Sequence, residues 1–191
     1  EVLANDGRNH LLRAREGYDV IIVDPSPPIY SAGTVNLYSR DFHLLARRRL
    51  RPGGILAVWM PFYPEPEYKM VMKSFLDSFP HTQVWNAARR GGGVVMLGSD
   101  SPLSVDRARI AARLQRPEVR ADLLEYNKEF ETEASFWELY LGPGERFAAY
   151  LAATPVVTDA YPWIEYPYFR SREKSYYRAP EFLSWPPYRP E

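Results

Sequence analysis

Cysteine is absent from the 191-residue sequence, and histidine occurs only three times. Without cysteine there is no disulfide framework, no thiol nucleophile and no cysteine-ligated zinc. His10, His43 and His81 lie far apart and lack the spacing of metal ligands. They are therefore interpreted as surface or packing residues, and no metal site is predicted.

A net charge and a long apolar run are also absent. The 24 Lys and Arg residues balance the 24 Asp and Glu residues, so the composition offers no electrostatic argument for a nucleic-acid partner. No run approaches the roughly 20 apolar residues of a membrane span, and no signal peptide is recognisable. The first residue is Glu1, and a strand-like segment follows at once, which indicates a fragment whose beginning lies elsewhere.

The most informative stretch runs from residue 18 to residue 60. Residues 20–23 form a continuous β-branched run, typical of a strand buried on both faces of a parallel sheet. The run stops at Asp24, and the prolines after it cannot continue a central strand. A helical pattern over residues 38–50 and a second apolar run over residues 55–60 complete a β-loop-α-β unit with a right-handed crossover. In such units ligands bind at the carboxyl ends of the strands, where Asp24 lies.

The neighbouring segments are predicted to extend this unit. The first six residues are expected to close a strand, and a short helix follows it. Further along the chain, we expect one more helix and then an antiparallel hairpin at the sheet edge. These elements are assigned to residues 1–6, 9–15, 67–79, 82–87 and 94–97.

Asp24 is the strongest candidate for chemistry, because a carboxylate at a strand end can hold or deprotonate an amine. The alternative is that it caps the next turn. Asp6 and Gly7 offer a carboxylate and a close backbone approach to a ligand, although Asp-Gly is also a common turn. The loop of residues 25–36 is suited to a lid over a site, or is a plain connection. Asp159, near the tail, is interpreted as a capping or pairing residue.

Several of these segments resemble the spermidine/spermine synthase family. The closing segment, residues 158–166, resembles the end of the bacterial branch in which such a domain follows membrane helices. The segments that carry the family resemblance are Asn5-Asp6-Gly7-Arg8, Tyr18-Asp19-Val20-Ile21-Ile22-Val23-Asp24-Pro25-Ser26-Pro27-Pro28, Leu37-Tyr38-Ser39 and Arg51-Pro52-Gly53-Gly54.

The resemblance implies an α/β, Rossmann-like fold of the S-adenosylmethionine-dependent methyltransferase type, of which this chain holds the C-terminal part of the sheet. Residues 1–100 would form that part, residues 101–153 a helical extension, and residues 154–191 a Pro- and aromatic-rich tail packed on the domain. Because the first strands of the sheet would be missing, we expect an uncovered apolar sheet edge and a chain that is poorly soluble alone.

The resemblance also implies roles for individual residues. Asp6 and Gly7 match the Asp-Gly that meets the adenine of decarboxylated S-adenosylmethionine, and Ala32 matches an alanine that borders the nucleoside. Asp24 matches the first Asp of the Asp-Ser-Ser-Asp-Pro motif, between the aminopropyl donor and the attacking amine. The remaining three positions, on the substrate side or in the lid, are Ser26, Tyr30 and Tyr38.

Three departures from the family pattern stand beside these matches. Pro27 occupies the position of the motif's second Asp, which is thought to deprotonate the polyamine. Tyr30 and Ser31 replace the Gly and Pro of the Gly-Pro-Ala loop, and the Tyr-Pro-Ser-Gly stretch of the polyamine site has no match near residues 85–93. The Gly-rich nucleotide loop and the acidic ribose-binding residue belong to the half of the fold that precedes Glu1.

The function implied is aminopropyl transfer from decarboxylated S-adenosylmethionine, a co-substrate rather than a bound cofactor, to a small-molecule amine. The alternatives are an S-adenosylmethionine-dependent methyltransferase-like enzyme and a non-catalytic nucleoside-binding domain that regulates a membrane protein. The resemblance implies a cytoplasmic location, either free or tethered to the inner membrane by helices upstream of Glu1. It also implies that the protein acts either alone or as a homodimer.

Overall fold

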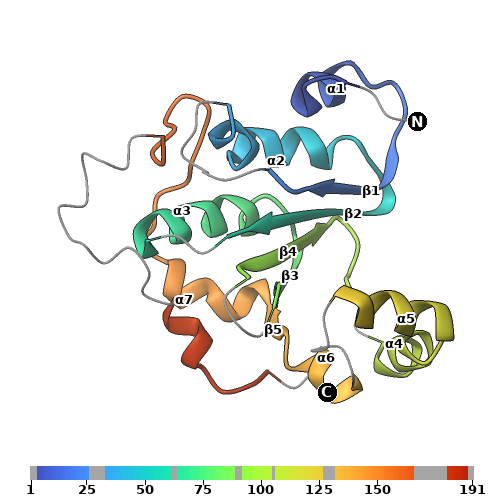
Figure 1. Cartoon of the computed structure of the whole chain (residues 1–191). Helices are drawn as coiled ribbons and strands as arrows, with labels where there is room; N and C mark the ends of the chain where they lie inside the picture. The colour runs from blue at the N-terminus through green and yellow to red at the C-terminus, as the bar shows by residue number, and fades with distance from the viewer. Residues whose placement is uncertain are drawn as a thin grey trace.

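A mixed β-sheet organises the fold of this computed structural model, which describes residues 4–25, 33–61, 64–88, 92–104, 106–126, 132–165 and 180–188 (Figure 1). The strand order is β1-β2-β4-β3-β5. The strands are β1 (Tyr18–Val23), β2 (Leu50–Met60), β3 (His81–Asn86), β4 (Val94–Ser99) and β5 (Tyr140–Pro143). The α-helices are α1 (Gly7–Arg13), α2 (Arg40–Arg47), α3 (Glu65–Leu76), α4 (Arg107–Leu114), α5 (Pro117–Tyr126), α6 (Glu133–Trp137) and α7 (Ala148–Leu151), and the 3-10 helices are η1 (Val35–Leu37), η3 (Gly144–Phe147) and η5 (Glu181–Ser184).

The predicted β-loop-α-β unit is confirmed. Strands β1 and β2 pair in parallel, with Val23 opposite Val58, and α2 lies between them in the sequence. α2 is shorter than predicted because the Ser39 hydroxyl caps it by accepting a hydrogen bond of 3.1 Å from the Phe42 N–H. β2 begins earlier than predicted, at Leu50, so the Pro-Gly-Gly segment lies inside the strand rather than before it.

The predicted hairpin forms, but not at the sheet edge. β3 and β4 are antiparallel, with Val84 opposite Met96, and β4 also pairs antiparallel with β2. The prediction of an edge position is wrong because β5, which comes from the segment predicted to be helical, pairs antiparallel with β3. β5 therefore forms the edge farthest from β1.

One face of the sheet packs on helices in a single core. Val58, Met96 and Val84 lie opposite one another on three successive strands, and all three are fully buried. The same core contains apolar side chains of α2 and α3. Three tail residues, far apart in this part of the sequence, also belong to it: Val157, Ile164 and Phe182.

The other face of β1 is open, which corrects the prediction that this strand is buried on both faces. Ile21 and Val23 point into the core, whereas Val20 is 54% exposed and Ile22 is 74% exposed. Successive side chains of a strand point to opposite faces, so covering one face leaves every second residue outside. The expectation of an uncovered sheet edge is confirmed within the described residues, because β1 has a strand partner on one side only.

His43 is a packing histidine, as interpreted from the sequence. It is fully buried in α2, with its ring 5.1 Å from that of Phe75 and 6.1 Å from that of Phe42. Neither ring nitrogen has a hydrogen-bond partner within the described part of the chain. Burial lowers the pKa of His43 to about 4, and the nearby backbone of Ser74 raises it by a smaller amount.

We predict that acid destabilises the protein through His43. Its pKa of about 4 in the folded state lies below the roughly 6.5 of an unfolded chain, so between these values the unfolded state binds more protons. Stability from this group is therefore present above about pH 6.5 and falls by roughly 3 kcal/mol as the pH drops towards 4. Urea unfolding near pH 7 and near pH 4.5 should show a smaller acid loss for His43→Leu than for the wild type. Equal losses in the two proteins would contradict the prediction.

Candidate functional site

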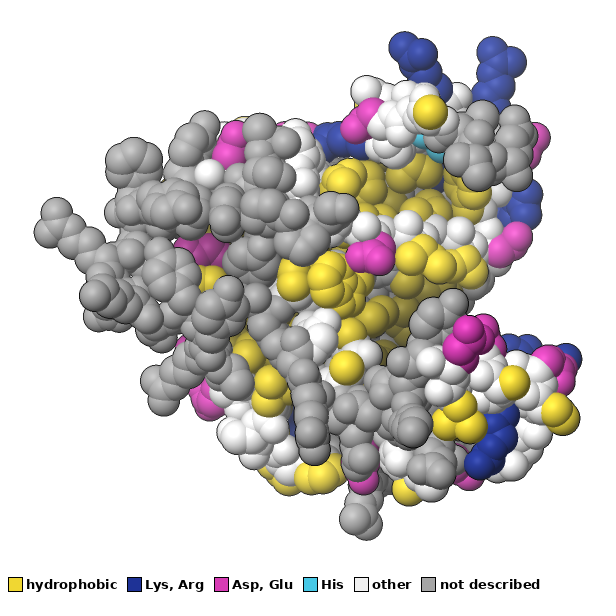
Figure 2. All heavy atoms as spheres, viewed as in Figure 1, with side chains coloured by type: hydrophobic (Ala, Val, Ile, Leu, Met, Phe, Trp, Pro, Cys, Tyr) yellow, Lys and Arg dark blue, Asp and Glu magenta, His cyan; other side chains and the backbone are white. Residues whose placement is uncertain are grey.

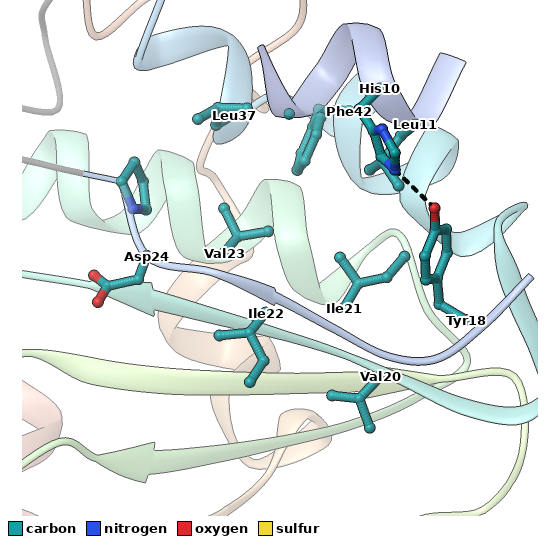
Figure 3. Close-up of a pocket in the computed structure, with 12 residues that line it drawn as sticks. His10, Leu11, Tyr18, Val20, Ile21, Ile22, Val23, Asp24, Leu37 and Phe42 are labelled. Atoms are coloured by element: carbon teal, nitrogen blue, oxygen red, sulfur yellow. Dashed lines mark hydrogen bonds between the residues drawn. The ribbon is translucent and has the colours of Figure 1, made fainter. Parts of the chain in front are cut away.

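A cavity of about 390 Å³ lies along β1, next to α1 and the start of α2 (Figure 3). Most of its wall is apolar, with Leu11 from α1, Ile21 from β1 and Phe42 from α2 among the lining residues. Gly7 and Asp24 line the same cavity. The structure therefore brings together one residue predicted to meet a nucleoside and the residue predicted to carry the chemistry.

Asp24 follows β1 directly, at the carboxyl end of the strand (Figure 3). Its side chain is exposed, and no residue in the described ranges hydrogen-bonds to its carboxylate. The helices that come next are bounded by other residues, because η1 starts after Thr34 and the Ser39 hydroxyl caps α2. Asp24 caps neither of these two helices, and its carboxylate is free to meet a ligand.

Asp6 is a helix cap rather than the end of a described strand. Its Oδ1 accepts a hydrogen bond of 2.7 Å from the Asn9 N–H, and α1 begins directly after it, at Gly7. Residues 4–6 are not part of a strand, and residues 1–3 lie outside the described ranges. The prediction that residues 1–6 close a strand is thus wrong for its described part, and Gly7 rather than Asp6 faces the cavity.

Tyr38 lies in the core and does not line the cavity. It is fully buried, and its hydroxyl donates a hydrogen bond of 3.1 Å to the Trp59 carbonyl at the end of β2. The structure therefore gives Tyr38 a packing position, and its predicted role at the substrate stays a prediction. Ser26, Tyr30 and Ala32, with most of the predicted lid, lie outside the described residues, and their roles stay predictions.

A polar cluster of Arg8, Ser39 and Asp159 was not predicted. The Arg8 guanidinium forms an ion pair with the Asp159 carboxylate, with 2.9 Å between Nη1 and Oδ1, and the Ser39 hydroxyl lies 2.7 Å from the same Oδ1. The hydrogen bond from Arg8 lowers the pKa of Asp159 despite partial burial. The interpretation of Asp159 as a pairing residue is confirmed, but its partner could not be read from the sequence.

Glu67 is a second acidic residue near the carboxyl ends of the strands. It lies in the first turn of α3, which follows the carboxyl end of β2, and is only 5% exposed. Its Oε2 atom has no hydrogen-bond partner among the described residues. The helix N-terminus favours a negative charge at this position.

Part of the cavity wall is the free edge of β1. In the described sheet, β1 pairs only with β2, so the backbone groups along its other edge have no strand partner. Figure 2 shows apolar side chains gathered in a hollow between the α1 end of the molecule and the α4–α5 pair. The unpaired edge of β1 and the apolar side chains of the hollow together form a surface that another segment can cover.

Ile21 and Ile22 offer a matched test of this asymmetry. We predict that Ile21→Thr destabilises the chain by about 2 to 3 kcal/mol, because it removes buried apolar contacts and buries a hydroxyl. Ile22→Thr should change stability by less than about 0.5 kcal/mol, as is usual at exposed positions. Urea unfolding of the natural protein that contains these residues measures both changes. Equal costs would show that the second face of β1 is covered in solution.

No protein-family model matches the sequence. The chain is nevertheless 32% identical over 129 residues to the polyamine aminopropyltransferase of Nitrosomonas europaea, a match that covers 60% of this chain and 37% of that protein. It is 45% identical over 58 residues to polyamine aminopropyltransferase 2 of Pseudomonas aeruginosa, with 30% of this chain and 17% of that protein covered. The matches thus span well under half the length of these two relatives.

Solved structures show the same fold. A probable spermidine synthase from Corynebacterium glutamicum matches with a TM-score of 0.55 at 16% identity, covering 83% of this chain and 54% of that one. The spermidine synthase of Thermotoga maritima matches with a TM-score of 0.51 at 18% identity, covering 79% and 49%. The predicted fold of the S-adenosylmethionine-dependent methyltransferase type is confirmed. The predicted resemblance to the spermidine synthase and polyamine aminopropyltransferase family is supported by sequence and by fold.

None of the helices in the described ranges is long and apolar enough to cross a membrane.

Proposed function

We propose that the protein is an aminopropyltransferase of polyamine biosynthesis, which transfers the aminopropyl group of decarboxylated S-adenosylmethionine to an amine. The position of Asp24 carries this proposal. Its carboxylate caps neither of the helices that follow it. It lies at the carboxyl end of β1 and lines the same cavity as Gly7. Similarity to curated polyamine aminopropyltransferases supports the same activity.

The reaction is an in-line displacement. The nitrogen of a neutral amine attacks the aminopropyl carbon next to the sulfonium, so an N–C bond forms as the C–S bond breaks. The bonding electron pair passes to sulfur, which leaves as 5′-methylthioadenosine, and the attacking nitrogen gives up a proton. The protein must align the two reactants and supply a base, and the Asp24 carboxylate is the group proposed to accept the proton.

The cavity suits the nucleoside part of the donor. Much of its apolar wall is the free edge of β1, which another segment can cover, so the nucleoside is proposed to lie at the end next to Gly7 and Asp24. Gly7 is exposed, and a side chain added there would meet nothing within 4 Å, so the backbone of this residue is accessible to a ligand. The chain covers 37% of the Nitrosomonas relative. We propose that a Gly-rich loop and a ribose-binding carboxylate complete the site from the part of such a protein that this chain does not span.

The acceptor side rests on fewer matched residues. Pro27 stands where the family has its second Asp, so Asp24 is the one motif carboxylate that remains. Ser26 and Tyr30 stay predicted contacts of the amine, and Ala32 a predicted contact of the nucleoside. Four finer predictions accompany the proposal: the domain boundaries at residues 100 and 153, the membrane-fused bacterial branch, the cytoplasmic location and the homodimer.

Asp24→Asn is the direct test in the natural protein that contains these residues. The change keeps the shape but removes the charge and most of the basicity. Aminopropyl transfer to putrescine, spermidine and other amines should fall by roughly two to four orders of magnitude, while nucleoside binding stays close to wild type. Asp19→Asn is the matched control, because Asp19 lies on the same strand and pairs with Arg51 outside the cavity. An Asp24→Asn enzyme as active as the wild type would remove Asp24 from the chemistry.

Two changes at Asp6 separate capping from ligand binding. Asp6→Ala removes both the cap and the charge, whereas Asp6→Asn keeps a good cap and removes only the charge. We predict that both weaken binding of 5′-methylthioadenosine, measured by titration, if the carboxylate meets the adenine. If Asp6→Asn binds the nucleoside like the wild type, Asp6 acts only as a cap. A wild type that binds the nucleoside but transfers to no amine would favour a methyltransferase, tested with S-adenosylmethionine, or a binding domain.

A further inference from the structure

We infer that Arg8 and Asp159 are positioning residues for the nucleoside side of the cavity. Their ion pair, here called the Arg8–Asp159 bridge, joins the start of α1 to the tail segment that is attached to the start of α2. The role of this bridge in nucleoside binding rests on the proposed function. The bridge itself is formed by described residues.

α1 has little apolar contact to hold it in place. It contains only seven residues, and Leu11 is its one buried residue. The residues just before it, Ala4, Asn5 and Asp6, are exposed. A short helix with one buried side chain depends on its polar contacts for a fixed position.

Arg8 supplies those contacts at the start of α1. Besides its pair with Asp159, its Nη1 donates a hydrogen bond of 3.2 Å to the carbonyl of Asn36 in η1. The planar guanidinium can bond a carboxylate through two nitrogens at once, which fixes direction as well as distance. Arg8 therefore joins α1 to both η1 and the tail.

Asp159 is itself fixed on the start of α2. Its N–H donates a hydrogen bond of 2.9 Å to Oδ2 of Asp41, and its carboxylate lies within hydrogen-bond distance of the Ser39 hydroxyl. Nearby, the Arg40 N–H donates to the Val157 carbonyl at 2.9 Å. The tail segment is thus attached to α2 through both backbone and side chains, and Arg8 attaches α1 to this assembly.

The elements joined by the bridge are the ones that wall the cavity. Gly7 of α1, Leu37 of η1 and Phe42 of α2 each line it. The far end of α1 has separate support, since Arg49 donates hydrogen bonds of 2.8 and 3.0 Å to the carbonyls of Leu11 and Leu12. Loss of the bridge should therefore free the start of α1, where Asp6 and Gly7 lie, while its end stays attached.

The experiment compares Arg8→Met and Asp159→Asn with the wild type in the natural protein. We expect binding of 5′-methylthioadenosine to weaken about 10-fold, the scale of a lost hydrogen bond to a charged group. The effect should fall on the KM for the nucleoside donor more than on kcat. Amide hydrogen exchange over residues 4–13 should become faster, because this segment loses its attachment. The loss in the double variant should be smaller than the sum of the two single losses, since both changes remove the same ion pair.

Arg47→Met and Asp100→Asn are the matched controls. They break another Arg–Asp pair, at the opposite end of α2, with 2.7 Å between Nε and Oδ1 and no contact with the cavity. Unchanged nucleoside binding in the controls supports the inference. Equal weakening in controls and bridge variants would overturn it, because the effect would then be general.

The outcomes also separate this inference from the proposed function. If the bridge variants weaken nucleoside binding but the wild type transfers to no amine, the proposed function fails and the inference stands. If the wild type does not bind the nucleoside, the proposed function and the inference both fail. Unchanged exchange over residues 4–13 in both bridge variants would overturn the inference in every case.

Discussion

The parallel pairing of β1 with β2 is the constraint on which the rest of the structure depends. Because β1 and β2 are parallel, with Val23 opposite Val58, their carboxyl ends lie at the same end of the sheet. The chain must therefore cross over through α2 to reach the start of β2. The crossover carries Leu37 and Phe42 to the cavity. Asp24 reaches the same place because its strand ends there. The site is therefore a product of the sheet order.

This pairing could be predicted because its signals are local. Two apolar runs, the prolines after Asp24 and a helical segment between them indicate the unit without knowledge of the neighbours. Burial of both faces of β1 could not be predicted reliably, since the composition of residues 20–23 is the same whether or not a helix covers Val20 and Ile22. β5 was missed because Gly142 and Pro143 are typical of turns, and its pairing with β3 comes from tertiary context.

The candidate site also contains residues that could be predicted from local sequence and residues that could not. Asp24 could be found from its place at the end of an apolar run. Asp6 was ambiguous, since aspartate favours both helix caps and ligand contacts, and the structure shows the cap. Tyr38 was placed on the substrate side by resemblance, and the structure shows that it is fully buried in the core. Arg8 and Asp159 are 151 residues apart, and no local pattern reports such a contact.

This separation in the sequence also predicts the order in which parts of the molecule fold. The β1–β2 pair closes a short loop, whereas the contact between Arg8 and Asp159 closes a loop of 151 residues. The entropy lost on closing a loop grows with its length, and non-local contacts form late in folding. We expect the sheet to be in place before α1 is held against α2. A newly made chain would then acquire its scaffold first and its affinity for a nucleoside last.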